Sequence, residues 1–232
     1  MVDFHSHILP AMDDGAADEV ASLTLLRQSA AQGITEVVAS PHFYWGEDTI
    51  EEFLARRQRC FDKLQPLLGE GLPSLRLGAE VFIREGISRL DLRPLCLQGT
   101  DIVMLEMPFP RMPYWLMEEL ENIVFGQRLR VMLAHLDRYM PGYTATDVAS
   151  LAELPEVIIQ LNAESFIDRH QLKSLVKWLP DVNRLVLGSD MHDTEIRVPK
   201  LAKAKETLSR HRIGREWLAR VAYTTEEILG NF

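Results

Sequence analysis

Short apolar segments alternate with longer amphipathic segments along this chain of 232 residues. The apolar segments contain almost no polar positions, which is typical of strands that are buried on both faces in a parallel sheet. Seven candidate strands follow from the pattern: Val2–Phe4, Ile34–Ala39, Leu75–Ala79, Ile102–Leu105, Val131–Ala134, Val157–Leu161 and Leu185–Leu187.

Helical patterns occupy the intervals between the strands. Asp18–Gln32 has apolar residues at helical spacing and is followed by Gly33, a residue that commonly ends helices. Thr49–Leu68 opens with the Thr-x-x-Glu spacing of a capping box. The other predicted helices are Pro113–Phe125, Thr146–Leu154, Asp168–Trp178, Val198–His211, Gly214–Tyr223 and Thr225–Leu229. The last of them has a Thr-x-x-Glu start at Thr224 and Glu227.

This repetition of strand and helix predicts an α/β protein with parallel strands and right-handed crossovers. Seven units in a chain of this length favour a closed or nearly closed β/α barrel, and an open doubly wound sheet is the alternative. No linker, repeat or low-complexity segment interrupts the sequence, so we expect residues 1–232 to form one domain.

Composition narrows the class of protein. The chain has 25 basic and 34 acidic residues and a net charge of -9, which disfavours nucleic acid or a membrane surface as its general partner. It shows neither a membrane-length apolar segment nor a cleavable leader, so a cytoplasmic location is expected. Cys60 and Cys96 form no CxxC motif and are expected to be buried thiols.

Histidines and carboxylates follow the predicted strands, at the end where β/α barrels build their active sites. Five of the seven histidines are in this group, whereas His170 and His211 lie in helical segments and are expected to be at the surface or structural. The complete group is His5, His7, Asp14, His42, Glu80, Glu106, His135, Asp190 and His192.

The spacing within this group predicts metal binding. His5 and His7 are two apart on an extended segment, which places both rings on one side, and Asp190 and His192 repeat the spacing. One HxH motif is weak evidence, and a lone buried carboxylate can be a structural ion pair. Several buried carboxylates at one barrel end need cations to compensate them, so we predict a polynuclear centre for zinc, manganese or iron.

These motifs, in this order, resemble those of the PHP (polymerase and histidinol phosphatase) superfamily. Within it, the chain resembles the bacterial tyrosine-protein phosphatases of the CpsB/CapC/YwqE type. The segments that carry the resemblance are Asp3–Pro10, Asp13–Gly15, Gly78–Glu80, Ala134–Tyr139 and Ser189–His192. The resemblance covers nearly the whole chain and implies a distorted seven-stranded, TIM-like (β/α)7 barrel. Phe43–Gly46 and Asn162–Ser165 depart from the family pattern, which affects substrate details but not the metal site.

The resemblance also implies up to three divalent metals, most often Mn²⁺, with Zn²⁺, iron or Co²⁺ as alternatives. The implied ligands are His5, His7 and Asp190 for the first metal; Glu106 and His135 for the second, with Glu80 as the bridge; and Asp14, His42 and His192 for the third.

The implied activity is hydrolysis of phosphotyrosine by a hydroxide that bridges the metals. The implied partner is a bacterial tyrosine kinase linked to capsule or exopolysaccharide synthesis. Arg138 and Arg197 are candidate catalytic phosphate clamps, because guanidinium groups bind phosphate in bidentate fashion; pairing with surface acids is the alternative. Asp190, Asp137 or a metal-bound water is the candidate proton donor.

Aromatic residues follow the second and fourth strands: Phe43, Tyr44 and Trp45, and then Phe109, Tyr114 and Trp115. Either they frame the pocket and contact a phosphotyrosine ring, with Tyr44 and Trp45 as the candidate substrate contacts, or they pack loops onto the barrel rim. Three other functions remain open. They are a phosphatase of a small ester such as histidinol phosphate, a phosphodiesterase or exonuclease, and a catalytically inactive metal-binding module.

Overall fold

Parallel strands form the centre of the protein in the computed structural model, which describes residues 1–179 and 182–230. The predicted domain of residues 1–232 therefore includes two short pieces, 180–181 and 231–232, that lie outside the described residues. The strands are β1 (Val2–Ser6), β2 (Glu36–Ala39), β3 (His42–Phe43), β4 (Ser74–Leu77), β5 (Glu80–Phe82), β6 (Ile102–Glu106), β7 (Arg130–Leu133), β8 (Val157–Asn162) and β9 (Leu185–Gly188).

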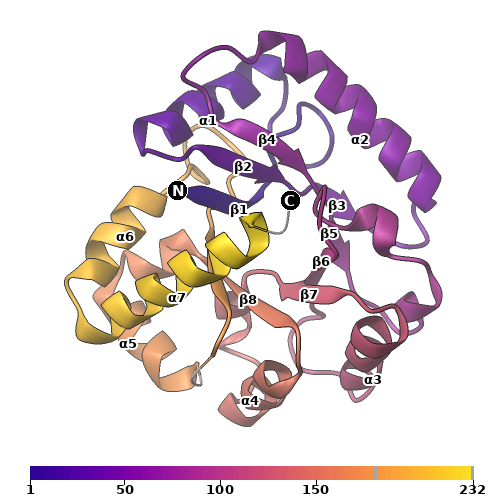
Figure 1. Cartoon of the computed structure of the whole chain (residues 1–232), viewed down its shortest axis with the longest axis vertical. Coiled ribbons are helices and arrows are strands. Elements are labelled where there is room, and N and C mark those ends of the chain that lie inside the picture. Colours follow the sequence, from indigo (N-terminus) through magenta and orange to yellow (C-terminus); the bar gives the residue numbers. More distant parts are fainter. Residues whose placement is uncertain (180–181, 231–232) are drawn as a thin grey trace.

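Helices lie around these strands, and α7 crosses in front of them in the view of Figure 1. The α-helices are α1 (Glu19–Ala31), α2 (Ile50–Leu64), α3 (Leu116–Glu121), α4 (Ala145–Glu153), α5 (Arg169–Trp178), α6 (Leu201–Ser209) and α7 (Arg212–Leu229). The short helical turns are η1 (Gln65–Leu67), η2 (Ile87–Arg89), η3 (Arg93–Leu95), η4 (Asn122–Gly126), η5 (Leu136–Tyr139) and η6 (Ala163–Phe166).

The strands pair in two sheets, in the orders β1-β2-β4 and β3-β5-β6-β7-β8-β9, and every pair is parallel. The prediction of an α/β protein with parallel strands is confirmed. The described residues form these two sheets instead of the one seven-stranded sheet that was expected.

The division into two sheets has a local cause. The second predicted strand stops at Ala39 because Pro41 follows and has no N–H for a strand ladder. The chain then continues as β3, and the third predicted strand divides in the same place into β4 and β5. Hydrogen bonds continue the pairing of the two segments across the break, from Gly78 N to Ala39 O at 2.8 Å and from Glu80 N to Pro41 O at 2.9 Å.

The carboxyl ends of β1 and β9 also meet. Ser6 forms a parallel bridge with Met191, and Asp190 N donates to His5 O at 2.8 Å. His7 N donates to Met191 O at 3.0 Å. The first and last strands of the chain are therefore held together at the end that carries the predicted ligands.

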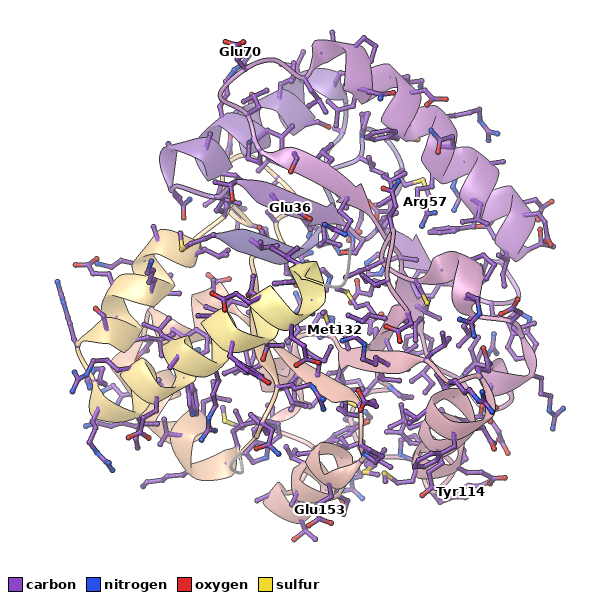
Figure 2. The ribbon with its side chains drawn as sticks, viewed as in Figure 1. Glu36, Arg57, Glu70, Tyr114, Met132 and Glu153 are labelled. Carbon is purple, nitrogen blue, oxygen red and sulfur yellow. The ribbon has the colours of Figure 1, made fainter. Side chains whose placement is uncertain are left out.

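Alternate strand residues face two hydrophobic layers, as the near-continuous apolar runs predicted. Ile102 and Met104 join Met132 in an inner cluster between the strands, and Met132 lies near the centre of Figure 2. Val103 and Leu105 belong to the larger cluster, which also includes helix residues. Burial on both faces contributes about 1.5–3 kcal/mol for each such side chain.

Two helix predictions are wrong. The predicted pair Gly214–Tyr223 and Thr225–Leu229 is the single helix α7. Thr224, which was expected to begin the second helix, is buried within α7, and its hydroxyl accepts a hydrogen bond from Leu185 N at 3.2 Å. The predicted helix Pro113–Phe125 begins only at Leu116 and ends in the π-helical turn η4.

Two smaller predictions, on the cysteines and on the capping of α2, are confirmed. Both cysteines are buried and form no disulfide in the described residues. Thr49 caps α2 in a complete capping box with Glu52. Within residues 1–179 and 182–230, no helix has both the length and the hydrophobicity that crossing a membrane requires.

Candidate metal centre

The motif at the end of β1 brings two imidazoles to one point. A register shift between Asp3 and Ser6 gives β1 one more residue than the facing stretch of β2. His5 and His7 are both fully buried, and their Nε2 atoms lie 3.2 Å apart. Two ring nitrogens this close fit a shared cation better than two separate structural roles.

Glu80, at the start of β5, lies at the centre of the cluster with a side chain only 1% exposed. Its Oε2 is 3.1 Å from His5 Nε2, 3.2 Å from His7 Nε2 and 3.2 Å from His42 Nδ1. Its Oε1 is 2.7 Å from His135 Nε2. Burial raises the pKa of Glu80, but His5 and His135 outweigh it and hold the pKa well below its usual value.

Asp190 follows β9 and presents its two oxygens to different neighbours. Oδ1 faces the histidines, at 3.7 Å from His5 Nε2, 3.5 Å from His7 Nε2 and 3.5 Å from His192 Nδ1. Burial acts to raise the pKa of Asp190, but the positive charges of His5 and Arg138 outweigh it and lower the pKa. Asp190 is therefore an ionised acceptor at neutral pH.

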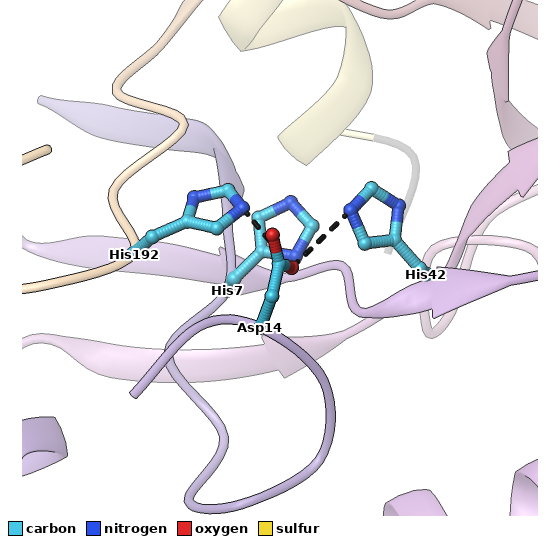
Figure 3. A group of neighbouring side chains, drawn as sticks. All are labelled: His7, Asp14, His42 and His192. Atoms are coloured by element: carbon cyan, nitrogen blue, oxygen red, sulfur yellow. Dashed lines mark ion pairs between the residues drawn. The ribbon is translucent and has the colours of Figure 1, made fainter. Parts of the chain in front are cut away.

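Asp14 closes the cluster on the solvent side (Figure 3). Its carboxylate lies between His42 and His192, with Oδ1 at 3.5 Å and 3.4 Å from the two Nε2 atoms. Its side chain is 65% exposed, whereas His192 is buried. This side of the cluster is the one that a ligand from solution can reach.

Glu106, at the end of β6, completes the group. Its Oε1 is 3.7 Å from His135 Nε2, and its Oε2 is 4.0 Å from His42 Nδ1. Burial, together with the negative charge of Glu80, raises the pKa of Glu106 to about 6. A cation between the two carboxylates would remove that repulsion.

All nine predicted side chains therefore meet in one cluster, and its chemistry fits divalent cations. The side chains form three sets, and within each set the ligand atoms all lie within 4.8 Å of one another. The sets are His5, His7 and Asp190; His7, Asp14, His42 and His192; and His42, Glu80 and Glu106. Buried His42 Nδ1, Glu80 Oε2 and His192 Nε2 make no hydrogen bond with another described residue. Leaving such atoms unpaired is costly, so these are the atoms that a metal ion would satisfy.

Comparison with known proteins identifies the family. The sequence profile described as "Capsular polysaccharide synthesis, CpsB/CapC" matches residues 1–229. The chain belongs to the CpsB/CapC family.

Individual members of the family agree with this placement. The CpsB/CapC protein is 34% identical to the tyrosine-protein phosphatase YwqE of Bacillus subtilis over 60% of this chain and 55% of YwqE. It is 24% identical to the tyrosine-protein phosphatase CpsB of Streptococcus agalactiae over 90% of both chains.

A solved structure from a study of YwqE from Bacillus subtilis and CpsB from Streptococcus pneumoniae superimposes with a TM-score of 0.79. The match covers 100% of this chain and 95% of that one at 21% identity. At that identity the match shows the fold, and the two proteins are described there as "unique metal-dependent tyrosine phosphatases".

Further polar residues of this CpsB/CapC protein orient the histidines, and sequence reasoning did not assign them. Asp13 Oδ2 accepts a hydrogen bond from His7 Nδ1 at 2.7 Å. Gln160 Oε1 is 3.0 Å from His5 Nδ1 and accepts from His135 N at 2.6 Å. Such partners fix the ring orientation and tautomer of metal-binding histidines. The signal for Gln160 was a polar residue inside an otherwise apolar strand.

Two glycines allow the cluster to assemble. A Cβ at Gly15 would lie 2.2 Å from His7 O, and a Cβ at Gly188 would lie 2.5 Å from His5 Cβ. Only glycine fits these positions without displacing His5 or His7.

The predicted phosphate clamps lie beside the cluster. Arg138 Nη2 forms an ion pair with Asp190 Oδ2, and Arg197 Nη2 lies 3.1 Å from the same oxygen. Asn162 Nδ2 donates to it at 3.0 Å. Both arginines are partly exposed, and together with Asp190 they line one hollow.

The aromatic residues after β2 have separate roles. The Tyr44 ring stacks on His42 at 5.3 Å and is partly exposed, so it borders the cluster. Trp45 lies against Arg84, whose Cζ is 6.0 Å from the ring. Phe43 is fully buried against Phe53 and therefore cannot line the pocket.

The remaining aromatic residues and histidines lie elsewhere. Phe109 and Tyr114 are exposed, and Tyr114 projects from the edge of the molecule in Figure 2. His170 is exposed, and His211 is partly exposed beside α7. The two histidines that were expected to lie outside the site do so.

Proposed function

We propose that this CpsB/CapC protein is a metal-dependent protein-tyrosine phosphatase. The observation that carries the proposal is the convergence of nine histidine and carboxylate side chains on one partly open cluster. Two arginines border that cluster, as binding of a phosphate ester requires. The relatives named as tyrosine-protein phosphatases support the same conclusion.

The proposed assignment of ligands agrees with the geometric sets except that His135, which contacts both Glu80 and Glu106, takes the place of His42 beside them. His5, His7 and Asp190 would hold one metal. Glu80, whose two oxygens face different histidines, would bridge it to a second metal held with Glu106 and His135. The third would lie among Asp14, His42 and His192, where Figure 3 shows the carboxylate between the rings.

The residues of the chain then have distinct tasks. When bound, divalent metals supply Lewis acidity and lower the pKa of a water molecule into the neutral range. Arg138 and Arg197 bind and orient the phosphate oxygens, and Asp190 positions both guanidinium groups. Asp190, held ionised, acts here as an acceptor and not as a store of protons. A tyrosine leaving group has a pKa near 10 and needs little help from an acid.

The identity of the metal and of the partner belongs to the same proposal. The donor set contains nitrogen and oxygen and no sulfur, which suits Mn²⁺ as well as Zn²⁺, Fe²⁺ or Co²⁺. The family description, capsular polysaccharide synthesis, supports a tyrosine-phosphorylated protein of that process as substrate. We propose a bacterial tyrosine kinase in that role, and the cytoplasmic location stays a prediction.

We also propose that the two sheets are parts of one distorted seven-stranded barrel in a single domain. In this interpretation β2 with β3, and β4 with β5, are two interrupted strands. Hydrogen bonds support it at both places: those around Pro41 continue the pairing across the break, and the one from Asp190 N to His5 O joins the ends of β9 and β1. The larger hydrophobic cluster, which runs from Ile8 to Trp217, supports the single domain.

Metal analysis and a substrate panel test the function. Purified protein should contain about two to three transition-metal ions per chain, and a metal-free protein would contradict the proposal. Phosphotyrosine peptides should be hydrolysed in preference to phosphoserine peptides, histidinol phosphate and a phosphodiester. His135→Ala should abolish turnover while the fold is kept, and His170→Ala, at an exposed position, is the matched control.

A further inference from the structure

Two adjoining hollows lie beside Asp137 and Arg138, which line both. The first has a volume of about 240 Å³ and includes Arg138, Arg197 and Asp190 in its wall. The second has a volume of about 270 Å³. Ser165 and Gln171 line both, so the hollows form one continuous depression, which we name the Gln171 groove.

The near part of the groove offers hydrogen bonds. Gln171, on α5, is exposed, and its side-chain amide forms no hydrogen bond with another described residue. Ser165 donates its hydroxyl proton to Asp137 Oδ2, which leaves the Ser165 oxygen free to accept. An amide that both donates and accepts, beside a hydroxyl acceptor, matches the N–H and C=O groups of an extended peptide.

The far part of the groove is apolar. Met140, Pro141 and Leu175 line it. Met140 is partly exposed and Pro141 is exposed, so both present apolar surface to a ligand. The groove therefore changes from charged, beside the cluster, to polar and then to apolar as it leaves the cluster.

We infer that the Gln171 groove binds the peptide segment that flanks the phosphotyrosine of a protein substrate. The main chain of that segment lies along Gln171 and Ser165, and an apolar side chain lies against Met140 and Pro141. This inference rests on the proposed function, because Arg138 and Arg197 hold the phosphate where the groove begins. It gives a site whose cluster is only partly open a means to distinguish protein substrates from small phosphate esters.

The test compares substrates of increasing size on the Mn²⁺-loaded full chain. They are p-nitrophenyl phosphate, free phosphotyrosine and phosphotyrosine peptides that carry leucine or glycine on the amino or the carboxyl side. For the wild type, kcat/KM should be about tenfold higher for at least one leucine peptide than for free phosphotyrosine. Equal values for all peptides and free phosphotyrosine would overturn the inference.

Variants then locate the effect in the groove. Gln171→Ala should lower kcat/KM for the preferred peptide about fivefold, the equivalent of one hydrogen bond, with p-nitrophenyl phosphate affected less than twofold. Met140→Ala should reduce the preference for leucine over glycine. Gln65→Ala, at an exposed glutamine on η1, is the matched control for both. An equal loss with peptide and p-nitrophenyl phosphate in Gln171→Ala would show a structural role and refute the groove.

Binding separates this inference from the proposed function. Fluorescence anisotropy of a labelled phosphotyrosine peptide measures its Kd without turnover. If no phosphate ester is hydrolysed but Gln171→Ala weakens peptide binding about fivefold, peptide binding by the groove is supported and the proposed phosphatase activity is refuted. If esters are hydrolysed and Gln171→Ala leaves the peptide Kd unchanged, peptide binding by the groove is refuted and the proposed phosphatase activity is supported.

Discussion

Asp13 holds His7 in place, and Asp13→Asn tests whether that contact prepares the metal centre. The carboxylate accepts three hydrogen bonds: Oδ2 accepts from His7 Nδ1 at 2.7 Å and His42 N at 3.1 Å, and Oδ1 accepts from Gly15 N at 3.0 Å. Asparagine has one acceptor oxygen and no charge. Asparagine therefore cannot accept from His7 and His42 with one atom and from Gly15 with the other, and its hydrogen bond to His7 is weaker.

The size of the effect follows from the contact that is weakened. A hydrogen bond to a charged group contributes about 1.5–3 kcal/mol, and 1.4 kcal/mol corresponds to a factor of ten in an equilibrium constant. We therefore expect Mn²⁺ affinity to fall about 10- to 100-fold, which is also the usual effect of removing the partner of a metal-binding histidine.

Isothermal titration of metal-depleted protein with Mn²⁺ measures this affinity directly, and phosphatase activity against Mn²⁺ concentration gives a second estimate. Activity should largely recover at saturating Mn²⁺, because Asp13 acts through His7. Asp62→Asn, at an exposed position on α2, is the control. An unchanged Mn²⁺ affinity in a folded Asp13→Asn protein would refute the reasoning.

Three further predictions concern stability. Burial raises the pKa of Asp13, but its hydrogen bond with His7 outweighs this and lowers the pKa to about 2. Asp13 should therefore account for about 2 kcal/mol of the stability that the metal-free protein loses as pH falls from about 4 to 2, and urea titrations of Asp13→Asn should show a loss that is smaller by this amount. Gly188→Ala should lower the melting temperature and metal content, because its Cβ would lie 2.5 Å from His5 Cβ; Gly69→Ala, with nothing within 4 Å, should change neither. Thr224→Val should cost about 1–3 kcal/mol in urea with metal content kept, because Leu185 N loses its acceptor; a stability equal to that of Thr225→Val would contradict this.

The sequence predicted the strands well because each is a short apolar run buried on both faces. The second strand ends at Ala39 as expected, but the sequence could not show that the chain pairs again after Pro41, because β3 forms only by pairing with β5. The sequence also placed a helix start at Thr224, because a Thr-x-x-Glu spacing is the same whether threonine caps a helix or is buried within one. Only the tertiary contact with Leu185 distinguishes the two.

The candidate ligands were predictable because they come directly after strands, and parallel strands bring their carboxyl ends together. The residues that orient them were harder to find. Asp13 was visible beside Asp14, but the turn at Gly15 decides which of the two carboxylates accepts from His7 and which lies between His42 and His192. Gln160 was visible as a polar residue in an apolar strand, but its two histidine partners lie elsewhere in the sequence, so the pattern could not show what it contacts.

One carboxylate, Asp190, contacts the histidines through Oδ1 and the two arginines through Oδ2. A cation bound among the histidines changes how strongly Asp190 attracts the two arginines. An anion bound by the arginines likewise changes how strongly Asp190 attracts a cation. Occupancy of the metal site and of the anion site should therefore be thermodynamically linked, and the linkage is reciprocal. Whatever factor an inorganic phosphate ion contributes to Mn²⁺ affinity, Mn²⁺ must contribute to phosphate affinity. Product inhibition of this protein should accordingly depend on metal concentration.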